Sequence, residues 1–266
     1  MNIEDKNMKA TLITGATGGL GCCFALEFAK HGSNLVLVAR NEEKLNKLKK
    51  EVQDLYKVDV FTFACNLQDH EAPKQIREFT DSKDLFINIL INNAGFAEFG
   101  EFAKTDINRH LEMVDVNVRS LVELTHIYVQ DMIKNKEGKI MNLASIASFC
   151  AGPYMGTYYA SKAYVRLFSE ALAKELKKTG VTVTALCPGT TATGFEKAAH
   201  LDNSKLFRTL RVATPEKVAT YAYKKCMQGK EVAIHGTTNK ILIFSLRFVP
   251  RKFARSVIVK IQEKRH

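Results

Sequence analysis

Two patterns of hydrophobic and polar residues alternate along the chain, one with helical spacing and one that is almost continuously apolar. Leu45, Leu48, Val52 and Leu55 recur at helical spacing, whereas other stretches are almost continuously apolar. The apolar runs predict β-strands at residues 10–15, 34–40, 58–65, 86–95, 138–145, 181–189 and 232–236. The helical patterns predict helices over 19–31, 42–56, 71–80, 106–134 and 157–178, and another that begins at residue 214.

This alternation predicts the fold class. Strands that are apolar on both faces suit a parallel sheet covered by helices on both sides. No internal repeat and no flexible linker divides the chain. We therefore expect residues 1–266 to form one α/β domain, a doubly wound Rossmann fold with a mostly parallel sheet.

The composition bears on the cellular environment of the protein and on metal binding. The six cysteines show no CxxC pair, and a reduced, cytoplasmic environment with buried thiols is the simpler interpretation. The polar N-terminus lacks the apolar stretch of a signal peptide, and no run of eighteen uncharged apolar residues predicts a membrane span. The seven histidines are scattered without ligand spacing, so no metal is implied.

The net charge of +11 is concentrated at one end of the chain. Residues 240–266 hold eight Lys or Arg residues and a single acid, Glu263. This is a basic tail on a nearly neutral protein, which argues against nucleic-acid binding. Its basic and apolar residues alternate, and a helix-like pattern follows Pro250. Packing on its own domain or on a neighbouring subunit is expected first, and contact with an anionic membrane second.

A glycine-rich turn joins the first predicted strand to the first predicted helix. The segment TGATGGLG, Thr14 to Gly21, places Gly15, Gly19 and Gly21 where the chain must turn sharply. Glycines here let backbone N–H groups approach a pyrophosphate at the helix N-terminus. The spacing is TGxxxGxG and not the ordinary GxGxxG.

Further motifs follow in order on the predicted elements. NNAG closes the fourth strand at residues 92–95, Asn117 lies in a helix, Ser145 follows the fifth strand, and Tyr158 and Lys162 form YxxxK. Pro188, Gly189 and Thr193 complete PGxxxT after the sixth strand. Together these motifs resemble the classical short-chain dehydrogenase/reductase family over most of the chain. The GTTAT turn is similar to that of some bacterial hydroxysteroid dehydrogenases.

The resemblance implies a dinucleotide cofactor and assigns its contacts. They are Gly15, Thr17, Gly18, Gly19, Leu20, Gly21, Arg40, Asn66, Leu67, Asn93, Ala94, Gly95, Tyr158, Lys162, Pro188, Gly189, Thr191 and Thr193.

Two of these positions bear on which dinucleotide is bound. The second strand ends in Arg40 where an acid would favour NAD, and a guanidinium suits the 2′-phosphate of NADP(H). Gly18 stands where some NADP-preferring relatives carry a basic residue, so Arg40 must supply most of the preference. Asn66 replaces the usual acid near the adenine, and its carbonyl can still accept a hydrogen bond.

The resemblance also implies a proton-transfer mechanism. Hydride transfer to a carbonyl needs a proton donor, and a free tyrosine has a pKa of about 10. An ammonium one turn away would lower that pKa. Tyr158 would be the donor, Lys162 would tune it and hold the ribose, Ser145 would bond the carbonyl oxygen, and Asn117 would anchor a water. Tyr159 also lies within reach of the turn of Lys162, but only Tyr158 fits YxxxK, so Tyr159 is expected to pack.

The substrate is less constrained than the reaction. Residues 190–215 are expected to form a lid, whose Phe195, Leu201, Leu206, Phe207 and Leu210 either line an apolar pocket or pack the lid down. With Phe149, Tyr154 and Met155 nearby, a hydrophobic alcohol or ketone is expected, with a hydroxysteroid or bile acid first. A fatty-acyl or xenobiotic carbonyl stays open, as does a non-catalytic NADP-binding sensor. A homodimer or homotetramer is the expected assembly.

Overall fold

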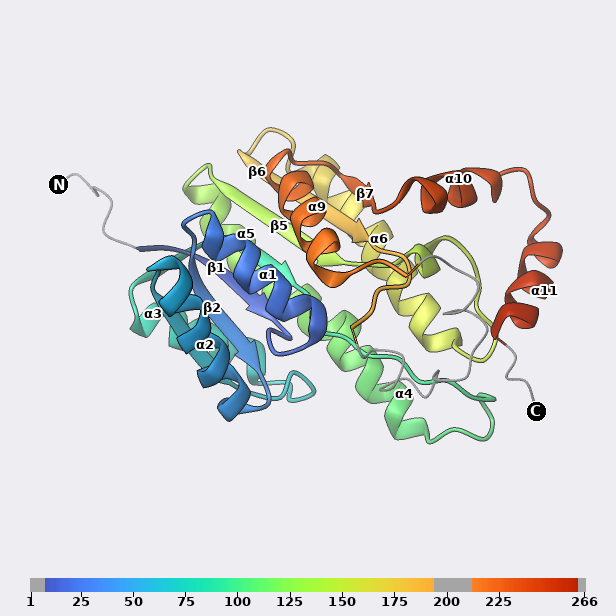
Figure 1. Cartoon of the computed structure of the whole chain (residues 1–266), viewed down its shortest axis with the longest axis horizontal. Helices are drawn as coiled ribbons and strands as arrows, with labels where there is room; N and C mark the ends of the chain where they lie inside the picture. Colours follow the sequence, from blue (N-terminus) through green and yellow to red (C-terminus); the bar gives the residue numbers. More distant parts are fainter. Residues whose placement is uncertain (1–7, 194–211, 263–266) are drawn as a thin grey trace.

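The computed structural model describes residues 8–193 and 212–262. Within them, one parallel sheet of seven strands has the order β3-β2-β1-β4-β5-β6-β7 (Figure 1). The second and third strands are added on one side of β1 and the later ones on its other side, beginning with β4, so the strand order reverses between β1 and β4. The strands are β1 Met8–Thr14, β2 Asn34–Ala39, β3 Val60–Ala64, β4 Leu85–Asn92, β5 Gly138–Leu143, β6 Val181–Cys187 and β7 Val232–Ile234. This confirms the predicted α/β doubly wound fold.

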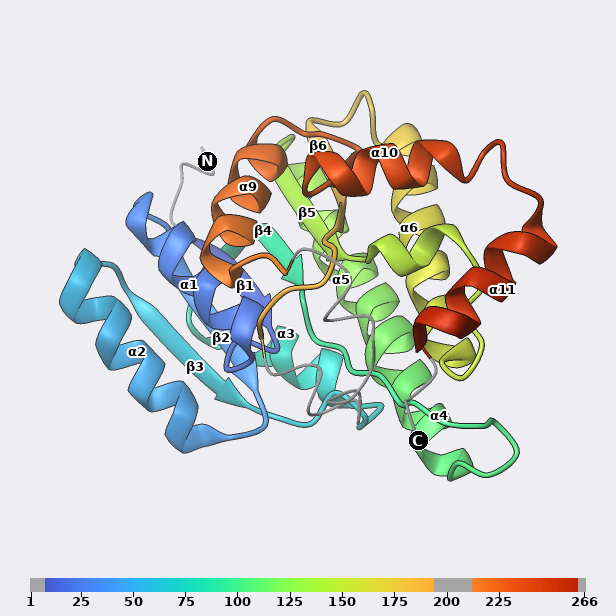
Figure 2. The same ribbon diagram turned by 45° about the vertical axis from the view of Figure 1, so that its right-hand side comes forward.

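Helices cover both faces of the sheet. One face carries α1 Gly19–Lys30, α2 Glu42–Tyr56 and α9 Pro215–Met227. The other carries α3 Ala72–Ser82, α5 Ser120–Lys134 and α6 Gly156–Glu175. The remaining elements are α4 Ile107–Val114, the π-helical turn η1 Asp115–Arg119, the 3-10 turn η2 Ile146–Phe149, α10 Thr237–Ser245 and α11 Arg251–Gln262. Figure 2 shows α10 and α11 passing along the edge of the molecule beside α6.

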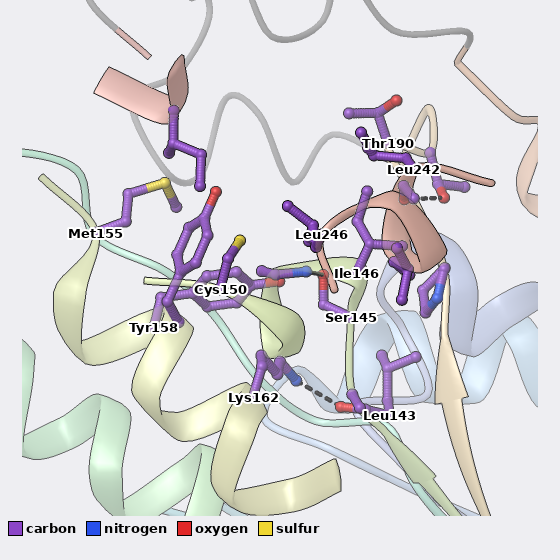
Figure 3. A pocket seen from close by; sticks show the side chains of 18 of the residues that line it. Leu143, Ser145, Ile146, Cys150, Met155, Tyr158, Lys162, Thr190, Leu242 and Leu246 are labelled. Atoms are coloured by element: carbon purple, nitrogen blue, oxygen red, sulfur yellow. Dashed lines mark hydrogen bonds between the residues drawn. The ribbon is translucent and has the colours of Figure 1, made fainter. Parts of the chain in front are cut away.

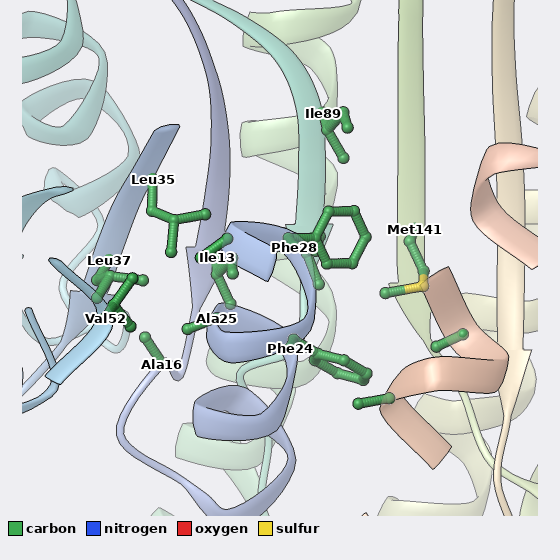
Figure 4. Packing of buried hydrophobic residues seen from close by; sticks show 14 of the residues in the cluster. Ile13, Ala16, Phe24, Ala25, Phe28, Leu35, Leu37, Val52, Ile89 and Met141 are labelled. Carbon is green, nitrogen blue, oxygen red and sulfur yellow. The ribbon is translucent and has the colours of Figure 1, made fainter. Parts of the chain in front are cut away.

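The core explains why each strand reads as a continuous apolar run. Ile13 faces the cluster beneath α1, whereas its neighbour Leu12 faces the cluster beneath α5. Figure 4 shows Phe24 and Phe28 of α1 packed against the sheet beside Ile13. Both faces of the sheet are therefore buried, as the sequence predicted.

Two differences from the predicted elements matter for the site. The helix expected over 106–134 is divided into α4, η1 and α5, and the π-helical turn lies at Asn117. The basic tail forms two helices, α10 as well as the one expected after Pro250. Most of the expected lid lies outside the described residues, although its two ends are joined by a parallel bridge between Thr191 and Ala213.

A buried chain of hydrogen bonds joins α6 to the sheet. Asn92 on β4 donates to Asn142 Oδ1 on β5 at 2.9 Å, and Asn142 donates to Ser169 Oγ on α6 at 2.9 Å. The Ser169 hydroxyl in turn donates to the Val165 carbonyl at 2.6 Å. All three polar side chains are at most 3% exposed. This chain holds the helix that carries Tyr158 and Lys162 against the centre of the sheet.

Ser169→Ala should therefore destabilise the protein by about 1–3 kcal/mol, because it leaves a buried donor of Asn142 without an acceptor. Urea unfolding followed by circular dichroism measures the loss. Ser82→Ala is the matched control, since that exposed hydroxyl bonds only to the Phe79 carbonyl and its removal should change stability by less than about 0.5 kcal/mol. Equal stabilities for the two variants would contradict the structural role of the chain.

Candidate active site

Two hollows adjoin at the carboxyl ends of the strands, where doubly wound folds bind ligands. The first is a cleft between the glycine-rich turn and the ends of β2 and β3. The second is an apolar pocket of about 420 Å3 between η2, α6 and the C-terminal helices. They share Leu20, Asn93, Gly95, Leu143 and Thr193, so the cleft leads directly into the pocket. Every position that the sequence assigned to the cofactor lines one hollow or the other.

The glycine-rich turn is held against the end of β4. Gly15 has a φ of +62°, and a Cβ there would lie 2.9 Å from the Ala94 Cα, so both conformation and space require glycine. The Thr14 hydroxyl accepts the N–H groups of Asn93 and Ala94 at 3.0 and 3.1 Å. The Asn93 amide donates back to the Thr14 and Gly15 carbonyls.

This turn leaves a helix N-terminus open to the cleft. Helix α1 begins after Gly18, which has no side chain to cap it. Its first N–H groups therefore receive no side-chain acceptor from the cap position, and Gly19 to Gly21 line the cleft, an arrangement that suits a phosphate.

The far end of the cleft is basic. Arg40 and Lys44 both line it, together with Asn41, whose side chain caps α2 by accepting the Lys44 N–H at 2.8 Å. Neither cation forms an ion pair with any described residue. Lys44 was not among the residues that the sequence assigned to the cofactor, although its place one helical turn past the strand end is a signal for a second cation.

Asn66 and Leu67 line the same end of the cleft. The Asn66 side chain is engaged locally, because it accepts the Gln68 N–H and donates to the Gln68 side chain at 2.8 Å. Its carbonyl oxygen retains a second lone pair for a ligand.

Ser145, Tyr158 and Lys162 meet where the cleft opens into the pocket (Figure 3). Ser145 follows β5 in extended conformation and caps η2, accepting the Ala147 N–H at 3.1 Å. Tyr158 shares a hydrogen bond with Ser145. Lys162 is 4% exposed and donates to the Leu143 carbonyl at 2.7 Å, with its Nζ 5.9 Å from the centre of the Tyr158 ring.

Burial dominates the ionisation of this pair. Loss of solvent raises the pKa of Tyr158 to about 12, and the bond with Ser145 acts in the opposite direction. Burial lowers the pKa of Lys162 to about 8. The sequence predicted that the Lys162 ammonium would lower the pKa of Tyr158, whereas burial raises it.

Asn117 lies behind the centre and not in it. Its Oδ1 accepts the Phe96 N–H at 3.1 Å, and its Nδ2 donates to the Phe96 carbonyl and to Ser161 Oγ at 3.0 and 3.1 Å. A Cβ on Gly95 would lie 3.0 Å from Asn117 Oδ1 and 3.3 Å from Lys162 Nζ, so both side chains flank Gly95. The π-helical turn aims this amide at the NNAG loop.

The apolar pocket takes only some of its wall from the residues that the sequence brought near it. Met155 lines it, but Phe149 packs under the Arg166 guanidinium and Tyr154 lies against Phe99. The lid side chains from Phe195 to Leu210 lie outside the described residues. Among the described residues, much of the wall comes from the C-terminal tail, including Leu242, Leu246, Val249, Phe253, Val257 and Ile258.

Tyr159 packs as the sequence predicted. It is 8% exposed and clusters with Ala97, Ala147 and Met155, although it also touches the pocket. A Cβ at Gly152 would lie 2.4 Å from its ring, so the ring lies directly on that glycine. Among the described residues, no three His, Cys, Asp or Glu side chains gather as metal ligands would.

A dinucleotide cleft that opens on a serine, a tyrosine and a lysine defines an oxidoreductase that moves a hydride to or from a carbon bearing oxygen. Residues 9–204 match the family model described as short chain dehydrogenase. The chain belongs to this family, and it is an NAD(P)-dependent oxidoreductase acting on CH–OH groups.

Two curated relatives illustrate the range of the family near this chain. The 7beta-hydroxysteroid dehydrogenase of Mediterraneibacter gnavus is 30% identical over 242 residues, which is 90% of each chain. The human very-long-chain 3-oxoacyl-CoA reductase is 29% identical over 239 residues, covering 88% of this chain and 72% of that protein.

Solved structures agree with these relatives. A 7beta-hydroxysteroid dehydrogenase structure has a TM-score of 0.84 at 28% identity, covering 97% of this chain and 99% of the other. A short-chain dehydrogenase from Sphingobium yanoikuyae in complex with NADPH has a TM-score of 0.80 at 28% identity, covering 90% and 94%.

Proposed function

We propose that this protein interconverts a secondary alcohol and a ketone on a hydroxysteroid, with bile acids as the first class to examine, and uses NADP(H). The main support for this proposal is that Ser145, Tyr158 and Lys162 lie at the junction of the cofactor cleft and an apolar pocket. A volume of about 420 Å3 is in the range of small-molecule sites. The similarity to 7beta-hydroxysteroid dehydrogenases supports the substrate class.

The residues present fit the cofactor. The uncapped start of α1 would hold the pyrophosphate, Asn93 to Gly95 and Thr193 border the passage toward the pocket, and Arg40 with Lys44 would bind a 2′-phosphate. When bound, NADP(H) supplies or accepts the hydride. The NADPH complex of the Sphingobium enzyme supports this choice.

In the reducing direction, the ketone oxygen gains negative charge as its carbon gains the hydride. Tyr158 donates its hydroxyl proton to that oxygen, which yields the alcohol and leaves a phenolate. Ser145 donates a second hydrogen bond and stabilises the developing charge. In oxidation, the phenolate takes the proton back.

Lys162 acts on the phenolate through its charge. With a pKa of about 8 it is mostly protonated at neutral pH, and its field favours the charged form of Tyr158 that appears during the reaction. Asn117 holds the loop that carries Gly95, so we assign it a positioning role; the water that the sequence reasoning gave it stays a prediction.

Reduction of a fatty-acyl carbonyl is the second candidate, supported by the similarity to 3-oxoacyl-CoA reductases. The homodimer or homotetramer, the cytoplasmic setting and the single domain over residues 1–266 stay predictions.

The proposed chemistry is tested by two adjacent tyrosines. Tyr158→Phe should lower kcat roughly a thousandfold, because it removes the proton donor. Tyr159→Phe is the matched control and should keep most of the activity, since its ring packs on Gly152. Turnover is followed by absorbance of the reduced cofactor with a panel of hydroxysteroids, bile acids and 3-oxoacyl thioesters.

Retention of NADPH binding by Tyr158→Phe, measured by fluorescence, shows that only chemistry is lost. Wild-type activity in Tyr158→Phe would refute the mechanism, and turnover of thioesters alone would replace the steroid assignment. Binding of NADPH without turnover of any panel member by the wild type would favour a sensor.

Reduction should depend on pH through Lys162. Below its pKa of about 8 the lysine is charged and stabilises the phenolate; as pH rises through that value the charge is lost and kcat should fall. The profile of kcat at saturating cofactor and ketone measures this. A falling limb only near pH 12, where Tyr158 itself would ionise, would contradict the role of Lys162.

Cofactor preference should depend on both cations at the cleft. Arg40→Ala and Lys44→Ala should each raise KM for NADPH roughly tenfold or more, because each removes a charged partner of a 2′-phosphate worth about 1.5–3 kcal/mol. KM for NADH should change little. Lys47→Ala, on the same helix but outside the cleft, is the control. An unchanged ratio of NADPH to NADH efficiency in both variants would contradict NADP selection by this pair.

A further inference from the structure

Residues 237–262 form a C-terminal arm, helices α10 and α11, that is attached to the body by few buried contacts. No residue of α10 is buried, and none of residues 252–260 in α11 is. Figures 1 and 2 show the arm at one end of the molecule and α2 at the other. A cation-rich helical pair whose described side chains are all at least partly exposed is expected to contact another surface through its apolar groups.

The arm has two apolar faces, and the pocket uses only one of them. Leu242, Leu246 and Val249 line the pocket at helical spacing. Ile241, Phe244 and Phe248 do not line it; they form a second face and are 65%, 58% and 74% exposed. The two phenylalanine rings lie edge to face with centroids 5.4 Å apart, so they make one continuous patch.

Positive charge surrounds this patch. Lys240, Arg247, Lys252, Arg255 and Lys260 are exposed, and no Asp or Glu occurs between residues 237 and 262. The Arg247 guanidinium lies 5.8 Å from the Phe244 ring, so charge and apolar surface are adjacent. None of these cations is paired with a described carboxylate.

We propose that the arm binds the surface of an anionic lipid bilayer, with Ile241, Phe244 and Phe248 inserted among the head groups. Exposed aromatic and aliphatic side chains beside Lys and Arg are what such surfaces attract. A second copy of the chain fits less well, because two arms without acids would repel each other. The binding is peripheral, since no helix of the described chain has the length and apolar character to span a bilayer.

The position of the arm beside the pocket links membrane binding to substrate access. Its inner face lines the reaction pocket, so a bilayer against its outer face would bring lipid-dissolved ketones close to Tyr158. This consequence rests on the proposed function, whereas binding itself can be measured without turnover.

The test is sedimentation of the full chain with vesicles of phosphatidylcholine alone or mixed with phosphatidylglycerol. The wild type should sediment with the anionic vesicles and be released at high salt. Phe244→Ser/Phe248→Ser should weaken this binding at least about tenfold, because two rings that would insert into the bilayer are lost. Leu55→Ser is the control, because Leu55 is 59% exposed on α2 at the opposite end.

Charge is tested separately. Lys252→Glu/Arg255→Glu should also weaken binding at least about tenfold, whereas Lys47→Glu/Lys50→Glu on α2 makes the same change in net charge and should not. Thermal melting and turnover of a water-soluble ketone confirm that the variants remain folded.

Three results would overturn the proposal. They are no sedimentation of the wild type, equal binding by the arm variants, and equal binding to both kinds of vesicle. Gel filtration adds a fourth: a dimer that Phe244→Ser/Phe248→Ser converts to monomer would show that a second copy covers the patch.

Discussion

The geometry of the site depends on the hydrogen bonds between Thr14 and Asn93, which join the ends of β1 and β4. The sheet reverses its order between these two strands, so a crevice opens there. The glycine-rich turn lies on one side of the crevice and the NNAG loop on the other. Because the bonds are buried, water competes with them little, and breaking one leaves an unpaired polar group in the core. These buried bonds therefore hold the two sides of the cofactor cleft at a fixed separation.

Buried hydrogen bonds also orient the residues beside the pocket. Lys162 on α6 reaches back to the Leu143 carbonyl at the end of β5, and Ser145 follows two residues later. The chain from Asn92 through Asn142 to Ser169 holds that helix at its middle. The core thus fixes the positions of Ser145 and Lys162. Burial has a further effect, because it makes the Tyr158 phenolate costly and the Lys162 charge easier to lose.

The sheet and the motifs at the ends of its strands could be predicted from the sequence because their signals are local. Strands buried on both faces are apolar throughout, and the residues of each motif lie together at a strand end, as do Gly15 and Gly19. The pocket wall could not be found in that way. In the segment from Ile241 to Phe248 apolar residues occur on all sides, so periodicity cannot distinguish the pocket face from the outer face. Phe149 and Tyr154 lie near the site in sequence but do not line the pocket, because Phe149 packs under Arg166 and Tyr154 packs against Phe99. The ionisation of Tyr158 was misjudged for a related reason, since depth of burial is a property of the folded chain.

The division between core and arm has a consequence for how substrate choice is set. Lys162 is buried and bonded to the end of β5, whereas Leu246 and Ile258 of the arm are only partly buried, so changes at these two positions should cost less stability. Elements with few buried contacts also open locally at low free energy, so the arm wall of the pocket can yield to ligands of different shape. The arm meets the core at Gly189. A Cβ on Gly189 would lie only 2.4 Å from the Asn239 side chain of α10, so the start of the arm packs directly on the turn that follows β6.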